Sequence, residues 1–494
     1  MEGLKSPQRV SAVATVVPSG TAPLIRGVTT DFAYMSIQEI QHLISTRQAS
    51  AVEVIGAALD RQDWLEPTLN AFVTRTPEMA LEAARKVDAQ IMRGDALGPL
   101  AGVPISIKDL IDVAGVPTTF GSRVMAQNVA KGDAPAVERV KHAGACVLGK
   151  TTTTEFGCKA GGGDSPLTGV TRNPWDTAKS TGGSSAGAAA SVAAGVTPIA
   201  VGTDGGGSCR IPAALCGLVG VKAQYGRVPV FPAGATPSLA HVGSIGRTVR
   251  DAAQLLQVLS GFDARDPAGV AQRVPDLIGA CDRGAANLRI AWSPTLGYAP
   301  VSDEVRQLTT SAVGRLEEAG CTVQTVDRVF PEDPIELWNA EFYAGVGLKL
   351  KSALYDSREL LDPAVVEVIE DALYSQSVEE YFLKYFQRFD LREHFRKFLE
   401  PYDLLITPTL PVADLAAGVN VPPELTDRNI VSWVYYTYPF NLTGNPAASV
   451  PCGFTAEGMP VGLQIVAKTL CEVNLFRLAG VLEAVSPWSH RHPV

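Results

Sequence analysis

A stretch rich in glycine, serine and threonine, from Thr151 to Ser208, places the strongest constraint on the fold of this chain. An alanine-rich segment at 185–195 predicts a helix within it, and an apolar run at 197–201 predicts a strand. A flexible linker would not contain such elements, so the small residues must serve close packing of the backbone. We therefore expect the stretch to surround a functional site in a packed domain.

Apolar patterns elsewhere alternate between the periods of strands and helices. Helices are predicted over 36–63, 77–93, 134–143, 302–319 and much of 335–400, and strands over 104–107, 145–148, 287–293, 320–327, 404–408 and 447–450. This alternation is typical of an α/β sandwich. Residues 1–30 carry no such pattern and are interpreted as a loose tail.

Composition excludes several classes of function. A length of 494 residues suits about three domains or one large α/β domain. The net charge of −9 argues against a broad nucleic-acid surface. No apolar run reaches the roughly 20 residues of a membrane helix. The eight cysteines form no C-x-x-C pair and indicate reduced thiols in a cytoplasmic protein, while the six histidines show no metal-ligand spacing.

Two short motifs match known patterns in letters only. Gly144–Thr151 fits the phosphate-loop pattern G-x-x-x-x-G-K-[ST], but its interior Ala-Cys-Val-Leu predicts a strand and a helix precedes it. Gly183–Gly187 fits G-x-S-x-G with Ser185 as nucleophile, but a loop interrupted by proline precedes it, and no histidine has surroundings that suggest a partner. We therefore set both motifs aside.

A third combination is chemically coherent. Lys108 ends the apolar strand at 104–107, and burial there would lower its pKa and allow it to act as a base. The competing interpretation is a surface lysine paired with Asp109. Successive N–H groups of Gly205–Ser208 could bind an oxyanion, although a flexible glycine turn is the plain alternative. A serine nucleophile needs such a positioned base.

Several long blocks of this chain resemble the amidase signature family. They are Leu100–Asp109, Thr171–Asp176, Gly182–Gly187, Thr203–Ser208, Arg210–Ala213, Cys216–Lys222 and Pro460–Ile465. The resemblance runs from about residue 36 to 485 and is specific, because the blocks occur in order. It implies one large α/β/α sandwich over 31–494 with a mixed central sheet, and a variable, aromatic-rich substrate-side region at 335–400.

The resemblance also implies a mechanism. Ser208 would be the acyl-forming nucleophile, Ser184 a bridging serine preceded by a cis peptide bond, and Lys108 the base. The N–H groups of Gly205, Gly206, Gly207 and Ser208 would form the oxyanion hole. The family needs no metal or organic cofactor and acts on small-molecule amides, and the resemblance leaves a homodimer open.

The departures from the family pattern concern the substrate. Ala223 and Gln224 follow Lys222 where Pro-Thr is usual, Cys209 replaces an aliphatic residue, and Gly161–Gly163 with Asp164 replace mixed residues in a loop over the acyl pocket. Cys158 falls at a substrate-contact position, or is a buried core cysteine.

The aromatic residues of 335–390, together with Trp433, Tyr435, Tyr436, Tyr438 and Phe440, either line a pocket or belong to the core. We expect an apolar amide, such as an aryl amide, anilide or carbamate, as substrate. The alternative is the glutaminase subunit of a tRNA-dependent amidotransferase. A non-enzymatic scaffold is disfavoured because all three catalytic positions are intact.

Overall fold

A computed structural model describes residues 31–493, so the tail predicted over 1–30 lies outside the described residues. From Phe32 onward the chain forms one compact unit. No helix within the described range is long and apolar enough to cross a membrane.

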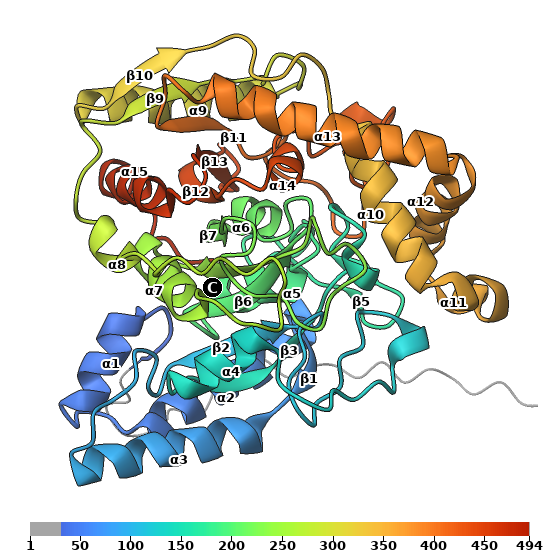
Figure 1. The fold of residues 1–494 in the computed structure, drawn as a ribbon. Helices are drawn as coiled ribbons and strands as arrows, with labels where there is room; N and C mark the ends of the chain where they lie inside the picture. Colours follow the sequence, from blue (N-terminus) through green and yellow to red (C-terminus); the bar gives the residue numbers. More distant parts are fainter. Residues whose placement is uncertain (1–30, 494) are drawn as a thin grey trace, which may run out of the picture. The chain divides into compact units, whose positions relative to one another are not determined.

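Eleven strands form one mixed sheet (Figure 1). In spatial order they are β1 (Phe72–Arg75), β3 (Cys146–Thr151), β2 (Pro104–Lys108), β6 (Ile199–Asp204), β8 (His241–Gly246), β7 (Val219–Lys222), β12 (Ala447–Phe454), β13 (Pro460–Ala467), β11 (Leu404–Pro408), β9 (Arg289–Trp292) and β10 (Thr322–Thr325). The β3–β2–β6 and β11–β9–β10 neighbours are parallel and all the others antiparallel. The short strands β4 (Asp164–Ser165) and β5 (Gly169–Val170) pair separately.

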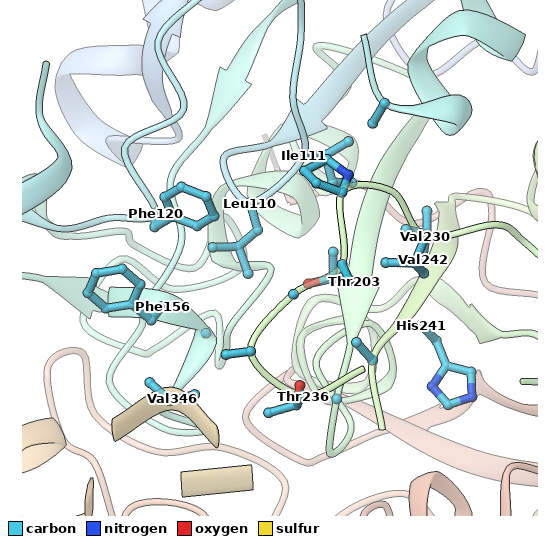
Figure 2. Close-up of a pocket in the computed structure, with 18 of the residues that line it drawn as sticks. Leu110, Ile111, Phe120, Phe156, Thr203, Val230, Thr236, His241, Val242 and Val346 are labelled. Atoms are coloured by element: carbon cyan, nitrogen blue, oxygen red, sulfur yellow. The ribbon is translucent and has the colours of Figure 1, made fainter. Parts of the chain in front are cut away.

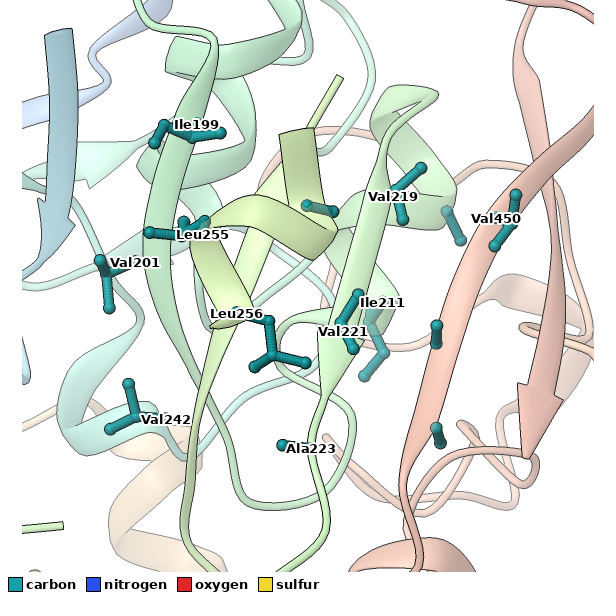
Figure 3. Packing of buried hydrophobic residues seen from close by; sticks show 14 of the residues in the cluster. Ile199, Val201, Ile211, Val219, Val221, Ala223, Val242, Leu255, Leu256 and Val450 are labelled. Carbon is teal, nitrogen blue, oxygen red and sulfur yellow. The ribbon is translucent and has the colours of Figure 1, made fainter. Parts of the chain in front are cut away.

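Helices cover both faces of the sheet. Ile199 and Val201 of β6 belong to the main apolar core, whereas Ala200 between them packs in a second cluster with residues of α5 (Ala186–Ala193) and α6 (Arg210–Cys216). Successive strand residues point to opposite faces. Figure 3 shows the main-core side, where Leu255 and Leu256 of α7 (Val249–Leu259) lie over the strands. The predicted α/β/α sandwich is therefore confirmed.

One of the predicted helices needs correction. The helix predicted over 36–63 is two helices, α1 (Ile37–Ser45) and α2 (Ala51–Leu69). The Ser50 side chain accepts from the N–H of Glu53, whose carboxylate accepts from the N–H of Ser50, and this capping box starts a new helix. The other helices outside the segment 335–400 and the glycine-rich stretch include α3 (Pro77–Arg93), α4 (Pro135–His142), α8 (Leu277–Ala280), α9 (Asp303–Glu318) and α15 (Glu472–Val485).

The segment 335–400 is helical, as predicted. It contains α10 (Ile335–Lys349), α11 (Lys351–Asp356), α12 (Pro363–Tyr374) and α13 (Val378–Phe398). α10 packs against α12 and α13, and it also contacts α14 (Pro439–Thr443) (Figure 1). α10 also packs against the glycine loop that follows the carboxyl end of β6, and parallel strands of an α/β sheet commonly present functional residues at such ends.

Candidate active site

Lys108, the last residue of β2, is fully buried. Its Nζ lies 2.7 Å from Ser184 Oγ and 2.8 Å from Thr203 Oγ1 of β6. The surface-lysine alternative is wrong, because Asp109 pairs with Lys150 instead, at 2.8 Å. The structure thus joins two of the three predicted catalytic side chains directly.

Burial lowers the pKa of Lys108 to about 7, even though the nearby charge of Asp204 acts in the opposite direction. Taking an ammonium group out of water disfavours its charged form. Lys108 is therefore substantially neutral at pH 7 and above, and a neutral amine can accept a proton.

Ser184 lies in the loop between β5 and α5, and the Gly183–Ser184 peptide bond is cis, as the resemblance implied. The Ser184 side chain is nearly fully buried. Gly157 borders it closely: a Cβ at Gly157 would lie 3.2 Å from Ser184 Oγ, and its φ of 75° suits glycine. The backbone therefore leaves space for little besides the serine hydroxyl at this point.

The glycine loop after β6 carries Ser208, which is 8% exposed and lines the same cavity as Ser184. The prediction for Gly207 needs correction, because its N–H donates to Asp204 Oδ1 at 2.8 Å and is not free for an oxyanion. The N–H groups of Gly205, Gly206 and Ser208 have no acceptor among the described residues. Three of the four predicted donors remain available.

A buried ion pair holds the base of this loop. Arg210 donates two hydrogen bonds to Asp204 and others to Thr437 O, Gln464 Oε1 and Asn441 Oδ1. Burial alone would raise the pKa of Asp204, but the charge and hydrogen bonds of Arg210 outweigh it and lower the pKa. Because every partner is buried and hydrogen-bonded, the loop has a defined conformation.

A cavity of about 400 Å³ opens over these residues. Its apolar lining comprises Leu110, Ile111, Phe120, Met125, Phe156, Val230, Phe231, Val242, Phe342, Val346 and Leu350, with several alanines and prolines. Figure 2 shows Leu110, Phe120 and Phe156 on one side and Val230, Val242 and His241 on the other. The charged lining residues are Asp112, which is half-buried, and Lys349, which is exposed. Such a site suits an apolar group next to the hydroxyl of Ser208.

Several expected site residues do not line the cavity. Cys158 is fully buried, and its carbonyl accepts from the Tyr343 hydroxyl at 3.1 Å, so the core-cysteine interpretation holds and the substrate-contact one does not. Gly161–Gly163 do not cover the cavity, and a Cβ at Gly161 would meet the Asn420 backbone. Among the aromatic residues singled out, Phe342 alone lines the cavity, and those of 433–440 are buried.

The two rejected motifs have structural roles. Residues 146–151 of the phosphate-loop match form β3, and Lys150 is buried against Asp109. Ser185 is fully buried and its hydroxyl donates to Thr203 O at 3.2 Å. No cluster of three or more metal-ligating side chains occurs between residues 31 and 493.

Sequence reasoning missed Thr203, Phe120 and Phe156. Thr203 is the first residue of the block Thr203–Ser208 and the second-last residue of β6. Its nearness to the end of β2 could be known only once β2 and β6 were known to be neighbours in the sheet. Phe120 and Phe156 have positive φ values of 55° and 48°, and no local sequence pattern predicts this backbone conformation. Their contribution to the cavity follows from the tertiary fold.

Comparisons with known proteins point to one family. The family model Amidase matches residues 53–476. An acylamidase of Rhodococcus erythropolis is 37% identical over 466 residues, covering 93% of this chain and 97% of that protein. A glutamyl-tRNA(Gln) amidotransferase chain of Moorella thermoacetica is 35% identical over 483 residues, covering 93% and 98%. The solved structure of a bacterial aryl acylamidase of the amidase signature family superimposes with a TM-score of 0.87 at 30% identity, covering 93% of this chain and 98% of that one.

Proposed function

This chain belongs to the amidase family and is an amide hydrolase, and we propose that it cleaves small amides with an apolar acyl or aryl group through a serine acyl-enzyme. Lys108, Ser184 and Ser208 form the proposed triad. The observation that carries the proposal is the 2.7 Å contact between buried Lys108 and Ser184, at the base of an apolar cavity that Ser208 also lines. The amide is a small molecule, and the chemistry requires no cofactor.

In the first half of the reaction, Ser208 Oγ attacks the amide carbonyl carbon. Its proton passes to Ser184, whose own proton passes to neutral Lys108 Nζ. The carbonyl electron pair becomes an oxyanion that the N–H groups of Gly205, Gly206 and Ser208 stabilise. The C–N bond then breaks, and the Lys108 ammonium returns the proton through Ser184 to the departing amine.

The second half of the reaction uses the same groups. Water attacks the acyl carbon of the Ser208 ester and passes a proton to Lys108 through Ser184. The oxyanion forms again, and Ser208 leaves as it regains a proton from this relay. The products are a carboxylic acid and the free enzyme.

The lining of the cavity favours an apolar substrate over glutamine. Glutamine would bring an α-ammonium and an α-carboxylate, which are costly to bury without charged partners. The two charged side chains of the lining, Asp112 and Lys349, both reach solvent, and the rest of the lining is mostly apolar, so the cavity interior offers glutamine no buried charged partner. The amidotransferase glutaminase is therefore the weaker candidate, although an amidotransferase relative is 35% identical.

A substrate panel tests this preference. We expect the purified chain to hydrolyse aryl amides and anilides without a partner protein, with kcat/KM about 100-fold or more above that for glutamine, because a mismatched polar group loses several kcal/mol in such a site. Release of aryl amine and of ammonia would be followed side by side, with short aliphatic amides and carbamates included. Comparable or better use of glutamine would instead support the glutaminase alternative.

A conservative change at Thr203 tests how Lys108 is oriented. Thr203→Val removes the oxygen that lies 2.8 Å from Lys108 Nζ and keeps the shape of the side chain. We expect kcat to fall about 5- to 10-fold because one hydrogen bond that directs the amine towards Ser184 is lost. Thr203→Ser restores the oxygen and should restore most of kcat. Equal activity of Thr203→Val and the wild type would contradict an orienting role.

A further inference from the structure

Trp338 of α10 contacts the glycine loop from outside the blocks that carry the family resemblance. Its indole Nε1–H donates to the carbonyl oxygen of Gly205 at 2.9 Å. The side chain is almost fully buried and stacks on Phe342, with ring centroids 4.3 Å apart and an angle of 16° between the rings. Phe342 in turn lines the cavity. A helix of the aromatic-rich region thus contacts both the cavity wall and the loop that follows β6.

The hydrogen bond of Trp338 determines where a neighbouring N–H points. In a trans peptide, the carbonyl of one residue and the N–H of the next point in opposite directions. The Gly205–Gly206 bond is trans, so an anchored Gly205 carbonyl turns the Gly206 N–H away from the indole. That N–H is one of the three loop donors without an acceptor among the described residues.

Other carbonyls of the loop have their own anchors. The Asp204 carbonyl accepts from Asn441 Nδ2 at 2.9 Å, which orients the N–H of Gly205. The Gly207 carbonyl accepts from the N–H of Ile211 at 2.7 Å, which orients the N–H of Ser208. For the peptide that presents the Gly206 N–H, the corresponding anchor is Trp338.

Close packing holds the Trp338 ring in place against the glycine loop. A Cβ added at Gly206 would lie 2.8 Å from Trp338 Cζ2, and one at Gly205 would lie 2.8 Å from Phe342 Cε2. The two rings therefore fit directly against the glycine backbone, and the peptide cannot rotate without displacing them.

We propose that Trp338 is a positioning residue for catalysis, which holds the Gly205–Gly206 peptide so that the Gly206 N–H faces the oxyanion. This inference rests on the proposed acyl-enzyme mechanism with Ser208 as nucleophile. The helix α10 thus has two roles in the site. Through the hydrogen bond of Trp338 it contributes to transition-state stabilisation, and through Phe342 it contributes to the wall of the cavity. An oxyanion gains from a donor only when the donor is held in place beforehand.

The test removes the indole donor and keeps the ring. Trp338→3-benzothienylalanine, introduced by genetic code expansion, replaces N–H by sulfur with little change in shape, and Trp338→Phe is the simpler companion. We expect kcat for an anilide to fall about tenfold with KM within about twofold, since the lost orientation affects the transition state. An aryl trifluoromethyl ketone, which adds Ser208 to form a tetrahedral oxyanion, should bind about tenfold more weakly. The matching methyl ketone, which forms little adduct, should bind unchanged.

Trp488 provides the matched control, because it is buried and its Nε1 donates to the Arg247 carbonyl at 3.0 Å, with no contact to the glycine loop. The same replacement there should leave the ratio of the two inhibition constants unchanged. Labelling of Ser208 by a fluorophosphonate probe tests the proposed function separately. If wild-type enzyme is labelled at Ser208 but the Trp338 variants keep the ratio of inhibition constants within twofold, the inference is wrong and the proposed function stands. If the wild type is not labelled at Ser208, the proposed function falls and the inference falls with it.

Discussion

Ser208→Ala is expected to abolish covalent labelling by a fluorophosphonate probe and to lower kcat by about 10⁴- to 10⁶-fold. The variant removes the oxygen that forms the acyl-enzyme, and nothing in the proposed mechanism can replace it. The loss of one hydroxyl from a side chain that is 8% exposed should have little effect on folding. Labelling is measured by intact-protein mass spectrometry, kcat by release of aryl amine, and folding by the thermal midpoint.

Ser185 supplies the control for this experiment. It lies next to Ser184 in the chain and fits the letters of a nucleophile motif, but its hydroxyl is buried and donates to the Thr203 carbonyl. We expect Ser185→Ala to retain labelling, and peptide mapping to place the label on Ser208. A label that persists in Ser208→Ala would assign the nucleophile to another residue and end the present mechanism.

The parts of the site that the sequence predicted are those written in contiguous blocks. Lys108, Ser184 and Ser208 each stand in a long, ordered match to the amidase signature family, and the strand before Lys108 already suggested a dry environment. The structure agrees that Lys108 is buried and adds its contact with Ser184. The sandwich could be anticipated too, because the apolar period of most strands and helices is a local property.

The parts that could not be predicted depend on contacts between distant segments. The N–H of Gly207 donates to the Asp204 carboxylate, which Arg210 holds in position. The sequence Gly205–Ser208 alone does not reveal which of its N–H groups remain free to bind an oxyanion. Trp338 reaches the Gly205 carbonyl from a helix 133 residues further along the chain. The sequence left Cys158 open between a substrate contact and a core position, and only the tertiary structure, in which its side chain is fully buried away from the cavity, separates the two.

Loss of the base should also be severe, although less so than loss of the nucleophile. Lys108→Met keeps most of the side-chain volume in a fully buried position and removes the amine. We expect kcat to fall about 10²- to 10⁴-fold, the usual contribution of a positioned base. Ser208 should remain accessible to a probe with a very good leaving group, so slow labelling of Lys108→Met separates loss of the base from loss of the fold.

The pH dependence of the rate tests independently whether Lys108 is the base. The reaction requires neutral Lys108, whose pKa burial lowers to about 7, so kcat/KM should rise about tenfold per pH unit below pH 7 and level off above it. Glu483 of α15 titrates in the same range, because burial raises its pKa to about 7. Glu483→Gln should keep the acid limb, whereas Lys108→Met should lose it. A wild-type profile that stays flat from pH 5 to 9, or a limb that disappears in Glu483→Gln and persists in Lys108→Met, would show that Lys108 is not the base.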